Sequence, residues 1–334
     1  MNMHFFDVTD QERAYLQEKL ADLQPIFHTE PLQTAEQAAT IADAEVISVF
    51  VHSTVTAEVI AALPKLKLIT TRSTGFDHVD LAAATAHGSI VCNVPTYGEN
   101  TVAEHAFALL LSLSRHISKA IGRTKTGNFS QEGLEGFDLK GRTIGVVGSG
   151  HIGQNVIKIA NGFGMDVVAF DAFPNQDLPA HLGFSYVSLE ELLAQSDVIS
   201  LHLPLLPTTQ HIVGREQLAL TKPGVIIINT ARGELIELPA LVEALESGKV
   251  GGAGLDVWEY EQLVIGKEAL PEVVGEQVAQ LDLLKRLMTR DNVVLTPHVG
   301  FDTVEAIYRI LDATIQTLRA AAAGTDIPNQ VHPK

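Results

Sequence analysis

The clearest indication of the fold is the stretch Thr143-Ile-Gly-Val-Val-Gly148-Ser-Gly150-His151-Ile152-Gly153-Gln154. Its apolar run predicts a buried strand, Gly-x-Gly-x-x-Gly follows directly, and a helix is expected to begin near His151. Gly148 permits a tight turn, Gly150 lets the backbone approach a pyrophosphate, and Gly153 lets the helix pack closely on the sheet. The N terminus of that helix would then bind the anion. The stretch predicts a dinucleotide-binding unit, with a purely structural glycine-rich turn as the alternative.

An acidic residue follows the next predicted strand, Asp166–Phe170. This residue, Asp171, stands 18 positions after Gly153. A carboxylate at this place accepts hydrogen bonds from the ribose hydroxyls of NAD and repels the 2′-phosphate of NADP. No Lys or Arg occurs in residues 172–177 to pair with such a phosphate. The sequence therefore predicts NAD rather than NADP, although Asp171 could also be an ordinary strand-end cap.

The composition restricts the classes of function. The chain has 334 residues, more than one compact core usually holds, and its 23 Lys and Arg against 40 Asp and Glu give a net charge of −17. This excess of negative charge disfavours nucleic acid and anionic membrane surfaces as partners. The single cysteine, Cys92, excludes an intrachain disulfide, and the N-terminal residues lack the pattern of a secretory signal. We expect a cytoplasmic protein with a small-molecule partner and no metal.

Short apolar runs alternate with helical patterns along the chain, which is typical of α/β proteins with parallel sheets. The predicted strands are His4–Asp7, Val46–Val51, Leu66–Thr71, Ile90–Asn93, Thr143–Val147, Asp166–Phe170, Val198–Leu203, Val225–Asn229, Gly254–Val257 and Asn292–Thr296. The predicted helices include Gln11–Leu20, Thr56–Ala62, a long one from about 101 to 121, and Thr303–Ala322.

This order predicts two doubly wound parallel-sheet domains of the Rossmann or flavodoxin type, with a cleft between them. The turn-rich stretch at 94–101 and the polar connection at 122–142 suggest the boundaries. We expect a discontinuous substrate-binding domain of residues 1–98 plus 300–334, and a NAD-binding domain of residues 99–299.

Three further motifs follow predicted strands of the second domain, where ligands of open α/β sheets bind. They are Asn229–Gly233, which contains Arg232; Gly254–Glu261, which is rich in acids; and Val294–His298, in which a proline precedes the histidine. An arginine can hold a carboxylate in two-pronged fashion, a histidine can give a carbonyl oxygen its proton, and an acid can fix the histidine tautomer. Each residue alone has an ordinary structural explanation. Together, they predict hydride transfer to a 2-keto acid.

The chain resembles the D-isomer-specific 2-hydroxyacid dehydrogenases. The resemblance extends from about Glu45 to the C-terminal helix. The motifs that carry the resemblance are Gly148–Gly153, Asn229–Gly233, Gly254–Glu261 and Thr296–His298. It implies that Arg232 binds the substrate, that Glu261 is the carboxylate paired with the catalytic histidine, and that His298 is the general acid and base.

Within that family, the chain looks most similar to the D-lactate dehydrogenase branch. The reasons are Thr71-Arg72-Ser73, Gly150–Gly153, and the 36 residues between Glu261 and His298. Gly300 departs from the branch, which usually has Ala there, and we expect this change to loosen the loop that carries Phe301. The reaction that this similarity implies is the reduction of pyruvate to D-lactate.

The resemblance also assigns binding residues. Those expected at the cofactor, besides the glycines and Asp171, are His151, Ile152, His202, Leu203, Pro204, Thr209, Thr230, Ala231 and Asp256. Those expected at the substrate are the amides of Ser73, Thr74 and Gly75, which could also form an ordinary turn, and Tyr97, which would close on the acid. From their positions at the end of an early strand and three residues after His298, Phe50 and Phe301 are expected to limit its size, with a place for Phe50 in the core as the alternative. His105 is interpreted as structural. A homodimer through residues 101–142 is implied as well.

Two other functions stay open at this stage. The first is a dehydrogenase for a bulkier or different acid, such as 2-hydroxyisocaproate, glyoxylate or hydroxypyruvate. The second is a binding module of the corepressor type, which shares this fold, senses NAD and can keep the same catalytic residues.

Overall fold

The computed structural model describes residues 1–332, and the chain divides into two compact units. Unit 1 comprises Met1–Tyr97 and the segment from Thr303 onward, and unit 2 comprises Gly98–Asp302. The second boundary lies three residues later than the sequence suggested. A physical reason is that the backbone N–H of Gly300 donates a hydrogen bond to the buried carboxylate of Asp256 in unit 2.

Unit 1 is built on a six-stranded sheet in the order β13-β5-β4-β3-β1-β2, with β13 antiparallel to β5 and the other pairs parallel. Its strands are β1 (Met3–Phe5), β2 (Ile26–Phe27), β3 (Val46–Val49), β4 (Leu68–Thr71), β5 (Ile90–Cys92) and β13 (Gln330–Val331). Its helices are α1 (Asp10–Lys19), α2 (Ala35–Ala39), α3 (Ala57–Ala61), α4 (Leu81–His87) and α13 (Val304–Ala323), with a 3₁₀ turn at Ala21–Leu23.

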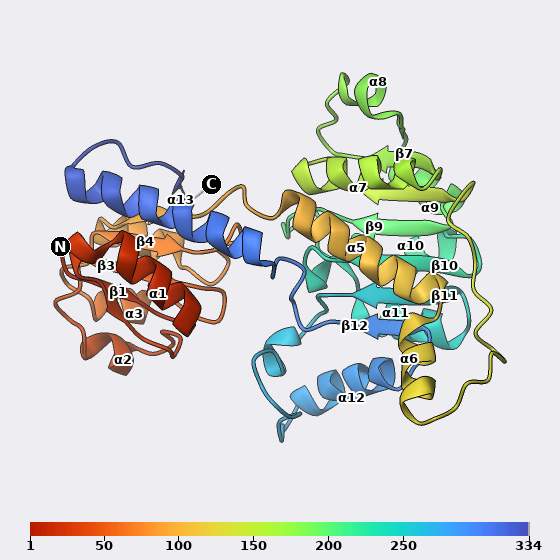
Figure 1. The fold of residues 1–334 in the computed structure, drawn as a ribbon, viewed down its shortest axis with the longest axis horizontal. Helices are drawn as coiled ribbons and strands as arrows, with labels where there is room; N and C mark the ends of the chain where they lie inside the picture. The colour runs from red at the N-terminus through yellow and green to blue at the C-terminus, as the bar shows by residue number, and fades with distance from the viewer. Residues whose placement is uncertain (333–334) are drawn as a thin grey trace. The chain divides into compact units, whose positions relative to one another are not determined.

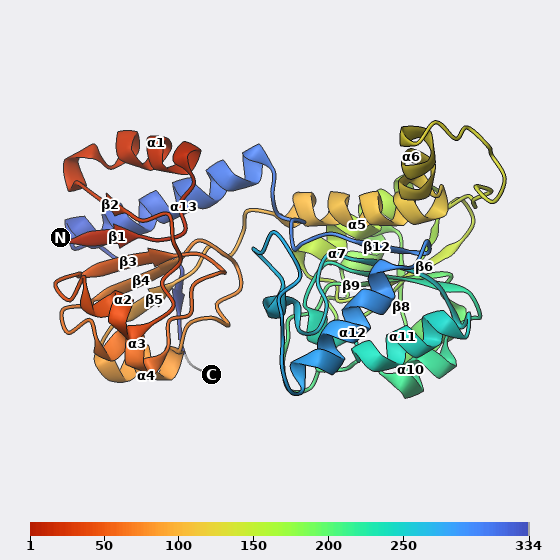
Figure 2. The ribbon, with the colours of Figure 1, turned by 90° about the horizontal axis from the view of Figure 1, so that it is seen from below.

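Helices cover both faces of this sheet, as the left-hand part of Figure 2 shows. Leu16 of α1 and Leu311 of α13 belong to the apolar core on one face, and Val59 of α3 and Ala84 of α4 belong to the core on the other. Burial on both faces explains why the central strands are continuous apolar runs in the sequence.

Unit 2 is built on a seven-stranded sheet in the order β12-β11-β10-β9-β6-β7-β8, and all its pairs are parallel. Its strands are β6 (Thr143–Val147), β7 (Asp166–Phe170), β8 (Ser185–Tyr186), β9 (Val198–Leu201), β10 (Val225–Asn229), β11 (Val250–Leu255) and β12 (Val293–Leu295). Its helices are α5 (Glu99–Ser114), α6 (Ile117–Lys125), α7 (His151–Gly162), α8 (Leu178–Leu182), α9 (Leu189–Gln195), α10 (Arg215–Leu220), α11 (Leu238–Glu246) and α12 (Gln277–Met288), with 3₁₀ turns at Gly233–Leu235 and Glu261–Leu263.

Successive residues of the central strands enter opposite cores. Val225 and Ile227 of β10 pack with α9, α10 and α11, whereas Ile226 and Ile228 pack with α5 and α7. Figure 1 shows α5 and α7 lying along the same face of this sheet. Two doubly wound α/β units are the class that the sequence predicts, and the structure confirms it.

The strand order places a ligand crevice in unit 2. From β6, the chain continues to β7 and β8 on one side, and then returns to β9 and the later strands on the other. Ligands of open α/β sheets bind at the carboxyl ends of the strands that flank such a reversal. The loops after β6 and β9 are therefore the first place to look for a cofactor site.

The long helix predicted at 101–121 is two helices. Helix α5 ends at Ser114, and α6 begins after His116, whose backbone has a left-handed φ of 50°. A left-handed residue ends an α-helix, so α6 starts in a new direction. None of the helices within residues 1–332 is both long and apolar enough to cross a membrane.

Candidate active site

The glycine loop after β6 has the geometry of a pyrophosphate site. Gly148 has φ +102°, and a Cβ there would lie 2.6 Å from the carbonyl oxygen of His202. At Gly153, a Cβ would lie 2.0 Å from the carbonyl oxygen of Gly148. A Cβ at Gly150 would face open space, and α7 begins there without a hydrogen bond from a capping side chain, so the N–H groups of this helix end can bind an anion. The loop fits a dinucleotide.

Asp171 lies directly after β7 and is fixed by three donors. Its Oδ2 accepts hydrogen bonds from the backbone N and Oγ of Ser149, both at 2.8 Å, and its Oδ1 accepts one from the N of Phe173 at 2.9 Å. Burial by itself would raise the pKa of Asp171, but these hydrogen bonds hold it below its usual range. The carboxylate is therefore ionised at neutral pH, as an acceptor for ribose hydroxyls must be.

His202 follows β9, on the other side of the glycine loop. Its Nε2 lies 2.8 Å from Ser200 Oγ, and its buried Nδ1 has no hydrogen-bond partner in the described part of the chain. Burial lowers the pKa of His202 to about 3, so the ring is neutral. A buried, unpaired ring nitrogen at the crevice is consistent with a missing polar ligand.

The other residues predicted at the cofactor are spread over the same edge of unit 2. His151 is largely exposed at the start of α7, and Thr209 Oγ1 donates to Pro204 O at 2.7 Å within the loop after β9. Thr230 Oγ1, just after β10, is buried without a hydrogen-bond partner in residues 1–332. Ala231 N donates to Asn229 Oδ1 at 3.1 Å.

His298 and Glu261 form a close pair. The Nδ1 of His298 lies 2.7 Å from Oε1 of Glu261, and Oε2 of Glu261 accepts a hydrogen bond from the N of Trp258 at 3.3 Å. The side chains of His298 and Glu261 are 28% and 22% exposed. Because the carboxylate is only an acceptor, Nδ1 carries a hydrogen, and Nε2 is the nitrogen that can exchange a proton with a ligand.

The turn that carries His298 is strained and firmly held. His298 has φ +56°, a left-handed backbone that residues other than glycine seldom adopt. Its N–H donates to Asp256 O and Thr296 O, both at 2.9 Å. The carboxylate of Asp256 accepts hydrogen bonds from Val299 N at 2.9 Å and from Gly300 N at 2.8 Å. Such over-determined strain is typical of functional sites.

Asp256 thus lies behind the histidine turn, with only 2% of its surface exposed. Burial alone would raise the pKa of Asp256, but hydrogen bonds from His105, Thr296 and Val299 hold it below its usual range. The hydrogen bonds of its carboxylate go to the protein itself. Its expected place among the cofactor residues stays a prediction.

Arg232 lies just past β10, in a loop fastened by Asn229. The Nδ2 of Asn229 donates to Arg232 O at 2.8 Å, and a guanidinium nitrogen of Arg232 donates to Ala231 O at 2.7 Å. At Gly233, a Cβ would lie 2.3 Å from Trp258 O, so the loops after β10 and β11 are in direct backbone contact. The segments that carry Arg232 and Glu261 are therefore locked together.

The substrate residues expected from unit 1 follow β3 and β4. The loop at Ser73–Gly75 is tied down by Ser73 Oγ, which donates to Gly75 O at 2.6 Å, and by Thr74 Oγ1, which donates to Val94 O at 3.0 Å. The ring of Phe50 lies 5.9 Å from that of His52, between centroids. Tyr97 is the last residue of the first segment of unit 1, and Phe301 belongs to unit 2.

Sequence reasoning missed the part that Arg72 plays in unit 1. Its guanidinium is fully buried and donates to Phe6 O at 2.8 Å, Asp7 O at 2.6 Å and Ser48 O at 3.2 Å. It thereby joins the carboxyl ends of β1, β3 and β4 beneath the predicted substrate loop. The available signal was a basic residue, Arg72, directly after a strand whose residues are all buried.

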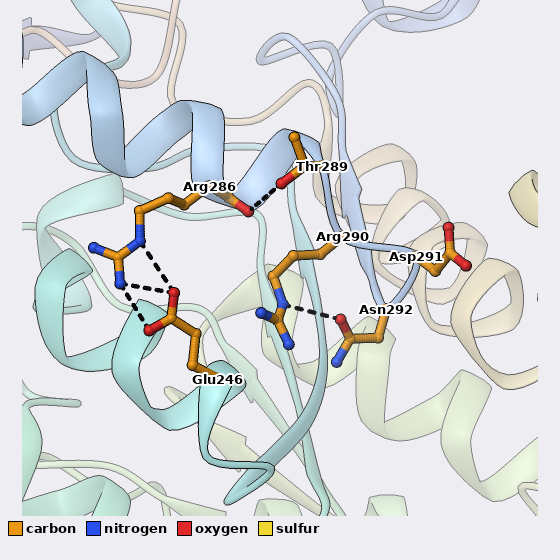
Figure 3. Close-up of a pocket in the computed structure, with 6 residues that line it drawn as sticks. All are labelled: Glu246, Arg286, Thr289, Arg290, Asp291 and Asn292. Carbon is orange, nitrogen blue, oxygen red and sulfur yellow. Dashed lines mark hydrogen bonds and ion pairs between the residues drawn. The ribbon is translucent and has the colours of Figure 1, made fainter.

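The open cavity of about 420 Å³ on unit 2 is a separate feature (Figure 3). It is lined by Glu246, Arg286, Thr289, Arg290, Asp291 and Asn292. Asn292 precedes β12 whereas His298 follows it, so this cavity lies at the opposite edge of the sheet. Arg286 and Glu246 form an ion pair across it, as Figure 3 shows. It lies away from the candidate site residues His298, Glu261 and Arg232, which follow strands at their carboxyl ends.

Comparison with known proteins shows which family the chain is similar to. Residues 107–300 match the family described as "D-isomer specific 2-hydroxyacid dehydrogenase, NAD binding domain". The chain is 40% identical to the D-lactate dehydrogenase of Escherichia coli over 302 residues, which is 90% of each protein. It is 41% identical over 255 residues to an aromatic 2-oxoacid reductase of Clostridium sporogenes, covering 76% of this chain and 75% of the relative. The solved structure of D-lactate dehydrogenase from Aquifex aeolicus, complexed with NAD and lactic acid, matches all of both chains with a TM-score of 0.88 and 36% identity.

Proposed function

The chain belongs to the D-isomer-specific 2-hydroxyacid dehydrogenase family, and from this premise we propose that it reduces a small 2-keto acid to the D-2-hydroxy acid, with pyruvate and D-lactate as the favoured pair. The resemblance read from the sequence is thereby confirmed at the level of the family, and NAD is the cofactor. The observation that carries the proposal is the contact of 2.7 Å between His298 Nδ1 and Glu261 Oε1, at the same carboxyl edge of the sheet as a complete dinucleotide loop.

The residues that would hold the cofactor are those at the carboxyl edge of the sheet in unit 2. The uncapped start of α7 at Gly150 suits the pyrophosphate, and Asp171 suits the ribose hydroxyls. When bound, NADH supplies the hydride that reduces the carbonyl carbon. Because Asp171 is ionised, a 2′-phosphate beside it would be repelled, which favours NADH over NADPH.

His298 would act as the proton donor. As the carbonyl carbon accepts the hydride, its oxygen becomes basic and takes the proton from Nε2 of His298. Glu261, held by the amide of Trp258, keeps the hydrogen of His298 on Nδ1 and stabilises the ring while it is charged. In the oxidation direction, the same Nε2 would accept the proton of the hydroxyl group.

Arg232 would orient the acid. Its planar guanidinium can bind a carboxylate or polarise the carbonyl with two parallel hydrogen bonds. We further propose that the backbone amides at Ser73–Gly75 bind the carboxylate, that Tyr97 closes on the acid, and that Phe50 and Phe301 limit its size. We also propose that the enzyme acts in the cytoplasm as a homodimer. Its partner would be the small acid, and we expect it to bind neither nucleic acid nor a membrane.

A second candidate is the reduction of an aromatic 2-keto acid. The observation that favours it is the identity of 41% to the aromatic 2-oxoacid reductase of C. sporogenes, which is as high as the identity to the D-lactate dehydrogenase of E. coli. An apolar pocket discriminates by only about 1–3 kcal/mol per methylene, so a preference for pyruvate should be graded.

The test is NADH oxidation against pyruvate, 2-ketobutyrate, 4-methyl-2-oxopentanoate, glyoxylate, hydroxypyruvate and phenylpyruvate. We expect kcat/KM to be highest for pyruvate and to fall as the side chain grows. A higher kcat/KM for phenylpyruvate or 4-methyl-2-oxopentanoate would overturn the pyruvate assignment in favour of the second candidate or of the isocaproate enzyme. Absence of turnover on every acid would favour a NAD-sensing binding module.

A further inference from the structure

His105 makes contacts that a residue with only a packing role would not need. It lies on α5, and its side chain, 20% exposed, reaches the turn that carries His298. Its Nε2 lies 3.0 Å from Thr296 Oγ1 and 3.3 Å from Asp256 Oδ1. The first of these contacts joins residues that are 191 positions apart in the chain.

The hydrogen bonds fix which atom of His105 carries hydrogen. Thr296 Oγ1 lies 2.6 Å from Asp256 Oδ1, and the hydroxyl donates because an ionised carboxylate can only accept. A hydroxyl has a single hydrogen to donate, so Thr296 Oγ1 must be the acceptor toward His105. Nε2 of His105 therefore bears a hydrogen and points it at the hydroxyl and the carboxylate.

These contacts act on the carboxylate that shapes the catalytic turn. Asp256 is almost fully buried, and its two oxygens receive the backbone N–H groups of Val299 and Gly300, the two residues after His298. A buried carboxylate keeps its charge and its position only when donors satisfy it. His105 supplies such a donor from a different element, the helix α5, and so holds Asp256 and Thr296 from behind.

Gly300 shows how closely these groups are packed. A Cβ at this position would lie 2.8 Å from Asp256 Oδ2 and 3.3 Å from Cδ2 of His105. There is no room for a methyl group between the turn, the carboxylate and the imidazole. A displacement of His105 would therefore be transmitted to the turn.

We propose that His105 is a positioning residue for proton transfer, a role that neither the sequence motifs nor the comparisons assign to it. The hydrogen on Nε2 of His105 points at Thr296 and Asp256. The carbonyl oxygens of these two residues accept the hydrogen bonds from the N–H of His298, which has a left-handed backbone. This backbone conformation directs the imidazole toward Glu261. His105 itself touches neither the acid nor the reacting atoms in this account. The inference rests on the proposed function for its kinetic consequence, but not for its hydrogen-bond geometry.

Two replacements of His105 distinguish the role of its hydrogen-bond donor from that of its ring. His105→Phe keeps a flat ring of similar size and removes the donor, whereas His105→Gln keeps an N–H donor near the place of Nε2 and removes the ring. A positioning role through the donor predicts that His105→Phe lowers kcat about tenfold or more, by analogy with the loss of a partner that orients a metal-ligating histidine. His105→Gln should stay within about threefold of the unmodified enzyme, because the buried oxygens of Thr296 and Asp256 would still receive a donor and would not be left unsatisfied.

The readouts are kcat and KM for the best 2-keto acid, the Kd for NADH from protein fluorescence, and the thermal midpoint. We expect the loss in His105→Phe to fall on kcat, with the Kd for NADH unchanged within about twofold. The matched control is His181→Phe on the exposed helix α8, which should change none of these quantities. A fully active His105→Phe variant, or a His105→Gln variant as impaired as His105→Phe, would overturn the proposal.

A measurement on the cofactor-free protein tests the geometry without any turnover. In protein labelled with ¹⁵N at histidine, the resonance that disappears in His105→Gln should show a protonated Nε2 at neutral pH. An unprotonated Nε2 would overturn the proposed network. If the unmodified enzyme reduces no 2-keto acid, the proposed function fails, while this spectrum still decides whether His105 donates to Thr296 and Asp256.

Discussion

His298 Nδ1 lies 2.7 Å from Glu261 Oε1, although the two residues are 37 positions apart in the chain. The contact follows from the topology of the sheet in unit 2. Glu261 comes after β11 and His298 after β12, and these strands are parallel neighbours. Their carboxyl ends meet at one edge, so a long insertion between them leaves the pair together.

Glu261→Gln is the most informative change at this pair. Glutamine keeps a carbonyl oxygen for the Nδ1 hydrogen but loses the charge that stabilises a protonated ring. We expect kcat to fall with little change in the Kd for NADH, which stopped-flow fluorescence can measure separately. The exposed Glu268→Gln, in the same insertion, is the control and should be silent. Equal kcat in Glu261→Gln and the unmodified protein would mean that the carboxylate charge plays no part.

The features that the sequence predicts well are those that local pattern determines. The strand Thr143–Val147, the glycines and Asp171 all belong to one continuous unit whose spacing is fixed by the geometry of a tight turn. The order of strands then places Arg232, Glu261 and His298 on one edge of one sheet. This part of the site could be predicted without coordinates.

The features that the sequence does not reveal depend on contacts between distant segments. The left-handed backbone of His298 depends on Asp256, and His105 reaches Thr296 from a helix that precedes the whole sheet of unit 2. A histidine inside an amphipathic helix has the same local pattern whether its side chain only packs or also donates a hydrogen bond, so the sequence favours a structural role for His105. The break between α5 and α6 likewise depends on one backbone angle, the left-handed φ of His116.

Cofactor choice should depend on Asp171. The unmodified enzyme is expected to prefer NADH, and Asp171→Ala should reduce the ratio of kcat/KM for NADH over NADPH about tenfold to a hundredfold, the range for a lost hydrogen bond to a charged group. The matched control is Asp177→Ala, a nearby exposed acid. Equal efficiency with both cofactors in the unmodified enzyme would contradict the assignment of Asp171.

Gly300→Ala should impair catalysis by pushing on the turn behind His298. The added methyl would lie 2.8 Å from Asp256 Oδ2, where the neighbouring groups are fixed by hydrogen bonds. The sequence suggests that Gly300 loosens this loop, whereas the structure shows that Gly300 fits a tight contact with Asp256. We expect a lower kcat, measured beside Gly122→Ala, a helical position of α6 with open space around it. Full activity of Gly300→Ala would show that the turn adapts without cost.

Acid should destabilise unit 1 through two stacked imidazoles. His4 Nδ1 lies 2.9 Å from His28 Nε2, and burial together with the neighbouring His28 lowers the pKa of His4. Burial also lowers the pKa of His28. Because both folded pKa values lie below the unfolded value of about 6.5, the unfolded chain takes up protons first, and the free energy of unfolding falls as the pH drops below that value.

His4→Phe keeps an aromatic ring at this position and removes one of the two titrating imidazoles. The fall in the thermal midpoint between pH 7 and pH 5 should therefore be smaller in His4→Phe than in the unmodified protein, as followed by circular dichroism. The control is His87→Phe in α4, a histidine outside this stacked pair. An unchanged pH dependence in His4→Phe would show that acid acts elsewhere in the chain.

In the proposed reaction, His298 gives the proton in the reduction of a 2-keto acid to its D-isomer. The most direct measurement is the consumption of NADH with pyruvate by the unmodified enzyme and by His298→Ala, with chiral analysis of the product and the Kd for NADH of both. We expect D-lactate from the unmodified enzyme and a kcat about 10²- to 10⁴-fold lower in His298→Ala, with the Kd for NADH preserved. L-lactate as the product, or a His298→Ala variant within a few-fold of the unmodified rate, would contradict it.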